Sequence, residues 1–225
     1  MRILVLCDDR WHPAEVAREG LAKLAGAEAS GDEAAGAEVA GSELAFDIIE
    51  DAGAFQPERL SDYPVVMLVK SDNTTAEDHT PWASDALQEA FVAYVEGGGG
   101  LLVVHSGTAS LRNLPALRAL VGGAFTHHPP RCPVTVEPAE DHPITEGVEA
   151  FTAEDEHYMM VLDDADADVF LTSVSEHGSQ PAGWTRRQGT GRVCVLTPGH
   201  TVEVWVHPSF QRLLCNALAW CEGGA

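Results

Sequence analysis

The sequence predicts an α/β domain with a doubly wound, mostly parallel sheet and helices on both faces. Three observations support this fold class. Short apolar runs alternate with segments of helical periodicity, which implies parallel strands joined by right-handed crossovers. Glycine or proline bounds several of these runs, as expected for strands that are buried on both faces. Four runs also end directly in polar side chains, at the edge where ligands bind in such sheets.

The composition fits one domain over residues 1–225, since 45% of the residues are hydrophobic and can form a sizeable core. No apolar stretch is long enough to span a membrane, and the first residues lack a signal peptide's long apolar region. We therefore expect a cytoplasmic protein. The 13 basic and 35 acidic residues give a net charge of −22, which argues against nucleic acid and anionic membranes as partners.

Two compositional features have no direct link to chemistry. The acidic, lysine-poor surface suits a salt-rich cytoplasm of the halophilic kind, while high-GC coding would also explain the excess of Ala, Gly and Arg. The stretch Gly26–Ser42 is rich in Gly, Ala, Glu and Ser, and we interpret it as a flexible acidic insertion.

The five cysteines form no C-x-x-C pair, so neither a disulfide framework nor a thiolate zinc site is expected.

The first half of the chain supplies most of the expected parallel sheet. The expected strands are Arg2–Cys7, Leu44–Glu50, Val65–Val69 and Leu101–Val104. The expected helices are one opened by Pro13, one over Trp82–Glu96, and one over Ser110–Val121 that Pro115 interrupts.

The alternation of strand and helix loosens in the second half. We expect a loop over Gly122–Pro133 that carries Phe125, His127 and His128. Short strands are expected at Val134–Glu137, Val169–Val174, Pro181–Arg186 and Gly191–Leu196. The motif D-E-H-Y-M-M lies within Phe151–Leu162, and Pro208 opens a closing helix that runs to Cys221.

Polar groups follow four of the apolar runs. They are Asp8 and Asp9, then Lys70, Ser71 and Asp72, then His105 and Ser106, and finally His200. If the four runs are parallel strands, all of these groups meet along one edge of the sheet.

His105 is the sharpest of these candidates. The stretch G-G-G-G-L-L-V-V-H-S-G-T at 97–108 has the layout of a nucleophile elbow, a turn that projects one side chain above the sheet. His105 occupies the projected position, and a histidine that merely caps a helix is the alternative. Ser106 is a second candidate nucleophile, one residue from that position and without an obvious base beside it.

Histidines and a carboxylate are available for acid–base chemistry or for binding a divalent metal such as zinc. His200 follows a Pro-Gly turn, and the A-E-D-E-H-Y stretch offers Asp155 and Glu156. The spacing is not H-E-x-x-H, and an acidic cluster in so acidic a chain is also typical of a solvated face. His127 and His128 are adjacent, and adjacent residues seldom bind the same ion.

A set of short motifs covers nearly the whole chain except Gly26–Ser42. They are D-Y-P-V-V-M-L at 62–68, the stretch at 97–108, G-G-A-F-T-H-H-P at 122–129, H-P-I-T-E-G at 142–147, D-E-H-Y at 155–158, P-A-G-W through G-T-G-R-V-C-V-L-T-P-G-H over 181–200, and the closing A-L-A-W. In their order and spacing, these motifs resemble the trehalose-utilisation (ThuA-like) family of the class I glutamine amidotransferase-like superfamily.

The resemblance implies a flavodoxin-like sheet with the site over its carboxyl edge. True glutamine amidotransferases have cysteine at the elbow, where this chain has His105, so glutaminase activity is not expected. The family match places His105, His128, Glu156 and His200 in the pocket. It also implies carbohydrate metabolism, notably of keto-sugars derived from disaccharides.

We therefore expect a sugar-acting hydrolase, lyase or isomerase in which His105, Glu156 and His200 act as catalytic groups or metal ligands. The candidates for substrate binding are Asp8, His12, Ser106, His128, Tyr158 and Trp184. Trp11, Trp184 or Tyr158 could stack on a sugar ring, with ordinary core packing as the alternative. Two other hypotheses stay open, namely a non-catalytic sugar- or metabolite-binding domain and a hydrolase that uses Ser106. Superfamily members often pair, so a homodimer is the expected assembly.

Overall fold

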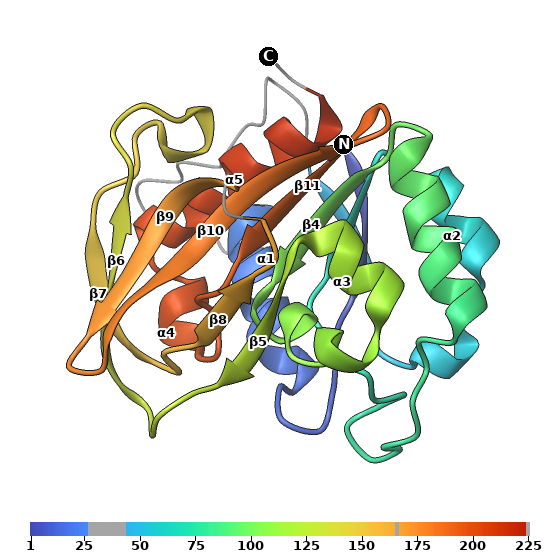
Figure 1. Ribbon diagram of the computed structural model, residues 1–225, viewed down its shortest axis with the longest axis horizontal. Coiled ribbons are helices and arrows are strands. Elements are labelled where there is room, and N and C mark those ends of the chain that lie inside the picture. The colour runs from blue at the N-terminus through green and yellow to red at the C-terminus, as the bar shows by residue number, and fades with distance from the viewer. Residues whose placement is uncertain (27–43, 165–166, 224–225) are drawn as a thin grey trace.

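The computed structural model describes residues 1–26, 44–164 and 167–223, so the expected insertion lies outside the described residues from position 27 onward. Within these ranges the main sheet has nine strands in the order β2-β1-β3-β4-β11-β10-β9-β6-β7 (Figure 1). No helix of the described part is long and apolar enough to cross a lipid bilayer.

One half of this sheet is parallel, as the sequence predicts. Its strands are β1 (Arg2–Leu6), β2 (Ala45–Ile49), β3 (Val65–Leu68), β4 (Gly100–Val104) and β11 (Gly191–Leu196). Leu6 of β1 pairs with Leu68 of β3, and Val104 of β4 pairs with Leu196 of β11. Because the last residues of these strands are in register, the residues that follow them lie at one edge.

Helices cover both faces of the parallel half. The bounds are α1 (Ala14–Leu24), α2 (Asp85–Glu96), α3 (Pro115–Val121), α4 (Val202–Trp205) and α5 (Pro208–Glu222). Helices α1, α4 and α5 pack on the face that includes Ile3 and Val5, whereas α2 and α3 pack on the face that includes Leu4 and Leu6. This alternation along β1 places one hydrophobic core on each side of the sheet, which confirms the α/β fold class.

Local sequence explains where two of these helices begin and end. Ser84 caps α2 by accepting a hydrogen bond from the backbone N–H of Leu87. Pro115 occupies the first turn of α3, where a missing N–H costs nothing, and it interrupts the predicted helix as expected. Gly122 ends α3 with φ +80°, a left-handed conformation that favours glycine.

The other half of the sheet is antiparallel. It consists of β6 (Cys132–Pro138), β7 (Phe151–Asp155), β9 (Asp168–Ser175) and β10 (Gly178–Gln188). Strand β10 also pairs antiparallel with β11, which joins the two halves into one mixed sheet.

The predicted loop over Gly122–Pro133 is wrong in part. Strand β5 (Gly123–His127) pairs antiparallel with β8 (Met159–Leu162) in a separate two-stranded sheet, and β6 begins at Cys132. The apolar part of this segment is short and lies between glycines and prolines, which favour a loop in the sequence. The strand is therefore evident only from its pairing with β8.

Short 3₁₀ turns complete the described elements at Ala52–Ala54, Pro57–Asp62, His105–Thr108, Leu111–Asn113 and Pro143–Thr145.

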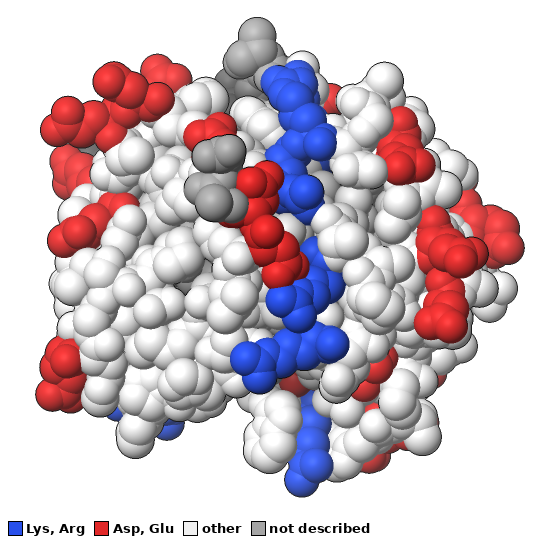
Figure 2. Space-filling view, in the orientation of Figure 1, with Lys and Arg blue, Asp and Glu red and all other residues white. Residues whose placement is uncertain are grey.

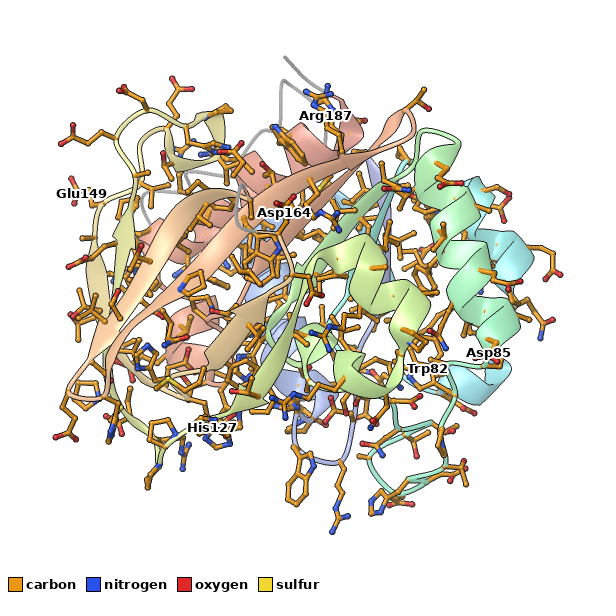
Figure 3. The ribbon with its side chains drawn as sticks, viewed as in Figure 1. Trp82, Asp85, His127, Glu149, Asp164 and Arg187 are labelled. Carbon is orange, nitrogen blue, oxygen red and sulfur yellow. The ribbon has the colours of Figure 1, made fainter. Side chains whose placement is uncertain are left out.

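Figure 2 shows that basic side chains form a band down the middle of the viewed face, with acidic side chains mostly toward its margins. Arg187, which Figure 3 labels, lies at the upper end of this band.

Candidate metal centre

Four segments that are distant in the sequence meet at the carboxyl edge of the sheet. They follow β1, β4, β7 and β11, and they contribute His12, His105, Glu156 and His200, respectively. Each of these residues offers one ligand atom, and the four atoms all lie within 4.8 Å of one another. The structure therefore brings the three predicted residues together and adds His12 to them.

Glu156 lies at the centre of this cluster. Its Oε2 atom is 3.2 Å from His200 Nδ1, 3.5 Å from His105 Nε2 and 3.9 Å from His12 Nε2. Although burial alone would raise it, the surrounding histidines hold the pKa of Glu156 below its usual range, so the carboxyl group is ionised.

The backbone presents His105 as the elbow interpretation predicts. His105 directly follows β4, is almost fully buried, and has φ +44°, a conformation that is uncommon for residues other than glycine. Its Nδ1–H donates to the carbonyl oxygen of Thr197 at 2.7 Å. In the neutral ring the Nε2 lone pair therefore faces Glu156 and the centre of the cluster.

His12 is oriented by a buried carboxylate. Its Nδ1–H donates to Asp9 Oδ1 at 2.8 Å, and Asp9 also accepts backbone hydrogen bonds from Trp11, His12 and Ser71. Burial opposes both charges, but the bond between the two side chains lowers the pKa of Asp9 to about 2. Asp9 and Glu156 together raise the pKa of His12 to about 9. A carboxylate behind a histidine in this way is typical of metal ligands.

His200 is held by the turn that carries it. Gly199 has φ +134°, and the buried carboxylate of Asp155 accepts hydrogen bonds at 2.9 Å from the backbone N–H groups of both Gly199 and His200. Asp155 comes from the end of β7, so the same short segment orients His200 and supplies Glu156.

Two ring nitrogens of the cluster lack a hydrogen-bond partner. His105 Nε2 and His200 Nδ1 are the buried side-chain nitrogen atoms that remain without one within the described residues. Both lie close to Glu156 Oε2, and an unpaired polar atom is costly in a buried position. Three imidazoles with one carboxylate are ligands that suit zinc and other first-row divalent metals. The residues present therefore fit such an ion.

A cavity of about 690 Å³ opens over the cluster. Besides His12, Glu156 and His200, its lining includes Trp11, Asn73, Ser110, Phe125, Arg131 and Tyr158. Tyr158 stacks on His105 with ring centroids 4.0 Å apart, and its hydroxyl lies 3.4 Å from His12 Nε2. Burial raises the pKa of Tyr158 well above its usual value, so the hydroxyl keeps its proton.

His128 lies at the wall of the same cavity. Its Nε2 is 3.4 Å from Glu156 Oε1, whereas the contacts of the other three histidines are to Oε2. Its Nδ1–H donates to the carbonyl oxygen of Pro129 at 2.7 Å. His127, labelled in Figure 3, lies at the end of β5 and does not line this cavity.

Three predicted substrate-binding residues do not face the cavity. Asp8 accepts hydrogen bonds from the backbone N–H groups of Ala14 and Ala76 and so joins the start of α1 to the loop that contains Ala76. Ser106 is buried, donates its hydroxyl proton to the carbonyl oxygen of Val69, and does not line the cavity. Trp184 is fully buried in the core. These placements correct the predictions for all three.

Two residues have larger roles in the structure than the sequence predicts. From the sequence, His12 is predicted only as a substrate-binding residue, and Asp9 only as one of the polar groups at the edge. Their position directly after the first parallel strand was the available signal. The pairing of Asp9 with His12 could not be found from it, because the loop after β1 turns back on itself through backbone hydrogen bonds between these two residues.

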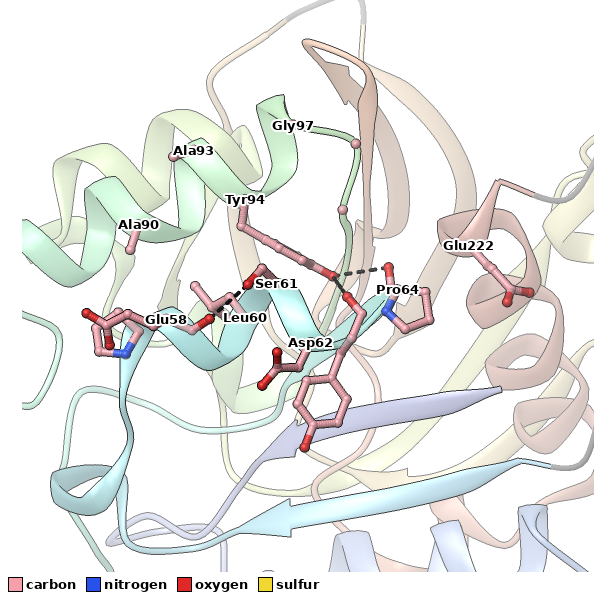
Figure 4. A pocket seen from close by; sticks show the side chains of 14 residues that line it. Glu58, Leu60, Ser61, Asp62, Pro64, Ala90, Ala93, Tyr94, Gly97 and Glu222 are labelled. Atoms are coloured by element: carbon pink, nitrogen blue, oxygen red, sulfur yellow. Dashed lines mark hydrogen bonds between the residues drawn. The ribbon is translucent and has the colours of Figure 1, made fainter.

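A second cavity, of about 800 Å³, lies at the opposite edge of the sheet, near the start of β4 (Figure 4). The hydroxyl of Tyr94 lies 3.1 Å from the carbonyl oxygens of Tyr63 and Pro64 at its wall. Its side chains form no group of converging metal ligands within the described residues. The smaller cavity over the histidines is therefore the candidate site.

A family model described as trehalose utilisation, ThuA, matches residues 2–221. The chain belongs to the ThuA family. Among curated proteins, none matches this ThuA chain.

Solved structures with the same fold include other ThuA-like proteins. A putative ThuA-like protein from Bacteroides uniformis has 22% identity and a TM-score of 0.72, over 98% of this chain and 91% of that one. One from Parabacteroides merdae has 15% identity and the same TM-score, over 99% and 90%. A β-galactosidase from Rahnella sp. R3 has 15% identity and a TM-score of 0.62, over 94% of this chain but 30% of the enzyme. At these identities the likeness shows the fold alone.

Proposed function

We propose that this ThuA-family protein binds a divalent cation such as zinc through His12, His105, Glu156 and His200, and performs acid–base chemistry on a small sugar-like molecule. The observation that carries the proposal is the pair of buried imidazole nitrogens, His105 Nε2 and His200 Nδ1, that lack partners beside one carboxylate oxygen. The bonds from His12 to Asp9 and from His105 to Thr197 support it, because they fix the rings in advance.

Each residue of the site has a role in this proposal. A cation held here would polarise a carbonyl or hydroxyl group and lower its pKa. His128 Nε2 lies at the cavity wall beside Glu156 and is placed to move a proton to or from the ligand. Tyr158 directs its hydroxyl toward His12 Nε2, where it can donate a hydrogen bond to a ligand oxygen.

The cavity supports a sugar-like ligand. Its volume of about 690 Å³ is in the range for small-molecule sites, and Trp11, exposed by 63%, offers an aromatic face at its lining. Asn73 and Ser110 add polar groups that can bind hydroxyls. The family's description, trehalose utilisation, agrees with this ligand class.

Glutaminase chemistry is not part of the proposal. His105 occupies the elbow, and all five cysteines are buried and absent from the cavity lining. Imidazole cannot replace a thiolate in forming a glutamyl thioester. A hydrolase, lyase or isomerase that works by proton transfer is therefore the reaction class we propose.

Metal analysis tests the proposal directly. We expect the purified protein, after dialysis against zinc and removal of free ion, to retain about one zinc per chain by elemental analysis. His105→Ala and His200→Ala should lose it, whereas His177→Ala, which changes an exposed histidine elsewhere, should retain it. Circular dichroism checks that each variant is folded. Zinc retention by both cluster variants would reject the site.

Activity on a panel of keto-disaccharides then separates enzyme from binding domain. Turnover by the wild type that falls in His105→Ala and His200→Ala supports catalysis. Zinc and sugar binding without any turnover would favour a non-catalytic binding domain on the same fold.

A further inference from the structure

We propose that the ligand of this cavity carries an anionic group, a phosphate or a carboxylate, which Arg131 binds at the cavity wall. This proposal rests on the function proposed above, because the hydroxyl- or carbonyl-bearing part of the same ligand would face the histidine cluster. It adds a substrate class, anionic sugars, that neither the fold nor the family description supplies.

Arg131 is a cation without a partner in the described chain. It is exposed, it is the one Lys or Arg residue among those lining the cavity, and within residues 1–26, 44–164 and 167–223 its guanidinium forms no hydrogen bond or ion pair. Other arginines are engaged, for example Arg118 by two hydrogen bonds to Asp163 and Arg186 by backbone carbonyls of α3. In a chain with 35 acidic residues, an arginine left unpaired at a cavity is available for a ligand.

The backbone places Arg131 next to the cluster. Cys132 of β6 pairs with Asp155 of β7 in an antiparallel ladder. Arg131 directly precedes Cys132 and Glu156 directly follows Asp155, so the two residues extend from the same end of this pair of strands. Both line the cavity. The Glu156 carboxylate is engaged by the histidines.

Proline restricts the segment that carries Arg131. The sequence reads H-H-P-P-R-C-P, so Pro129 and Pro130 precede the arginine and Pro133 follows Cys132. Proline fixes the backbone φ angle, and the residue before a proline is also restricted. Less conformational entropy is therefore lost when Arg131 binds a ligand than on an unrestrained loop.

The arginines at the cavity favour an anion. Glu156 is the single carboxylate that lines it, and its oxygens lie close to the histidines. A second guanidinium, from Arg10, lies 4.5 Å over the ring of Trp11, which lines the same cavity. Guanidinium groups bind both phosphate and carboxylate through paired hydrogen bonds, so the cavity is suited to a ligand with either of these anionic groups.

Calorimetric titration with three matched probes tests this. We expect D-glucose 6-phosphate or D-glucuronate to bind the zinc-loaded protein about tenfold or more tighter than D-glucose, the size expected for one charge-assisted hydrogen bond. Arg131→Gln should abolish that preference and leave glucose binding unchanged. Arg187→Gln, which changes an exposed arginine outside the cavity, should keep it. The phosphate and carboxylate probes show which anion is preferred.

Each adverse outcome has a separate meaning. Equal affinity of the wild type for charged and neutral sugars, equal loss in Arg187→Gln, or no sugar binding by a protein that holds zinc would overturn the anion proposal and leave the metal site standing. Failure to take up zinc would overturn the proposed function itself. Zinc content is measured on every variant, so the two failures are distinguishable.

Discussion

Replacement of Asp9 should weaken both the fold and metal binding. Asp9 is fully buried, and its Oδ1 accepts hydrogen bonds from the backbone N–H groups of Trp11 and His12 and from His12 Nδ1. Its Oδ2 accepts from the backbone N–H of Ser71 at 2.8 Å. Asp9→Ala leaves all four donors without this partner. In Asp9→Asn the amide oxygen can keep the first three bonds, while its NH₂ group faces the Ser71 donor.

The two variants should differ in size of effect. Removing one side of a buried charged pair costs about 3–5 kcal/mol, so we expect Asp9→Ala to lower the free energy of unfolding by that amount. Leaving one buried donor unsatisfied costs about 1–3 kcal/mol, so we expect Asp9→Asn to lower it by the smaller amount. Zinc affinity should fall about 10–100-fold in Asp9→Ala, because His12 loses the carboxylate that orients its ring.

Urea denaturation of the zinc-free protein gives the free energies of unfolding, and competition with a chelating dye gives the zinc affinities. Glu89→Ala, which removes an exposed carboxylate from α2, is the matched control. Ordinary surface substitutions change the free energy of unfolding by about 0.5 kcal/mol or less. The reasoning about this loop is refuted if the free energy of unfolding of Asp9→Ala differs from that of the control by no more than this and its zinc affinity is the same.

Three further outcomes are expected. Gly199→Ala should lower the free energy of unfolding by about 1–3 kcal/mol and weaken zinc binding, because Gly199 has φ +134° in the turn that carries His200. Unchanged zinc affinity in a chelator competition would contradict this. Trp184→Phe should cost a similar amount, about 1–3 kcal/mol by urea denaturation, because the Val121 carbonyl loses its donor, yet zinc affinity should not change. Asp163→Asn should lower the free energy of unfolding at neutral pH but not in acid. Hydrogen bonds from Arg118 lower the pKa of Asp163 in the folded protein, so the ionised form stabilises the fold above the unfolded pKa, and this stabilisation is lost as the pH falls through the folded pKa. A difference in the free energy of unfolding from wild type that persisted in acid would refute this.

The edge that carries the site could be predicted because parallel strands make neighbours of the residues that follow them. Asp9, His105 and His200 each come after a strand of the parallel half, and the register of these strands brings their ends together. Short apolar runs and their polar ends were sufficient signals for this part.

Glu156 could not be placed by the same argument. It follows β7, an antiparallel strand at the far end of the strand order, and only its resemblance to the ThuA motif suggested a place in the pocket. The structure connects it to the site through Asp155, whose carboxylate binds the turn after β11. Such a contact between distant segments leaves no periodic pattern in the sequence.

Trp184 shows the opposite limit. It lies on β10, where successive side chains point to opposite faces, and the sequence alone did not show which face meets the core. In the structure its indole N–H reaches the carbonyl oxygen of Val121, at the end of α3. Two aromatic residues that do line the cavity, Trp11 and Tyr158, lie in connections between elements.

The separation of the four cluster residues along the chain has a consequence for biosynthesis. His12 is synthesised well before His200, which lies in the turn between β11 and α4, so a nascent chain has no complete ligand set until the segment with His200 has left the ribosome. The strand that presents His200 must then insert between β4 and β10. Ion capture at full affinity would therefore be a late event that follows assembly of the sheet.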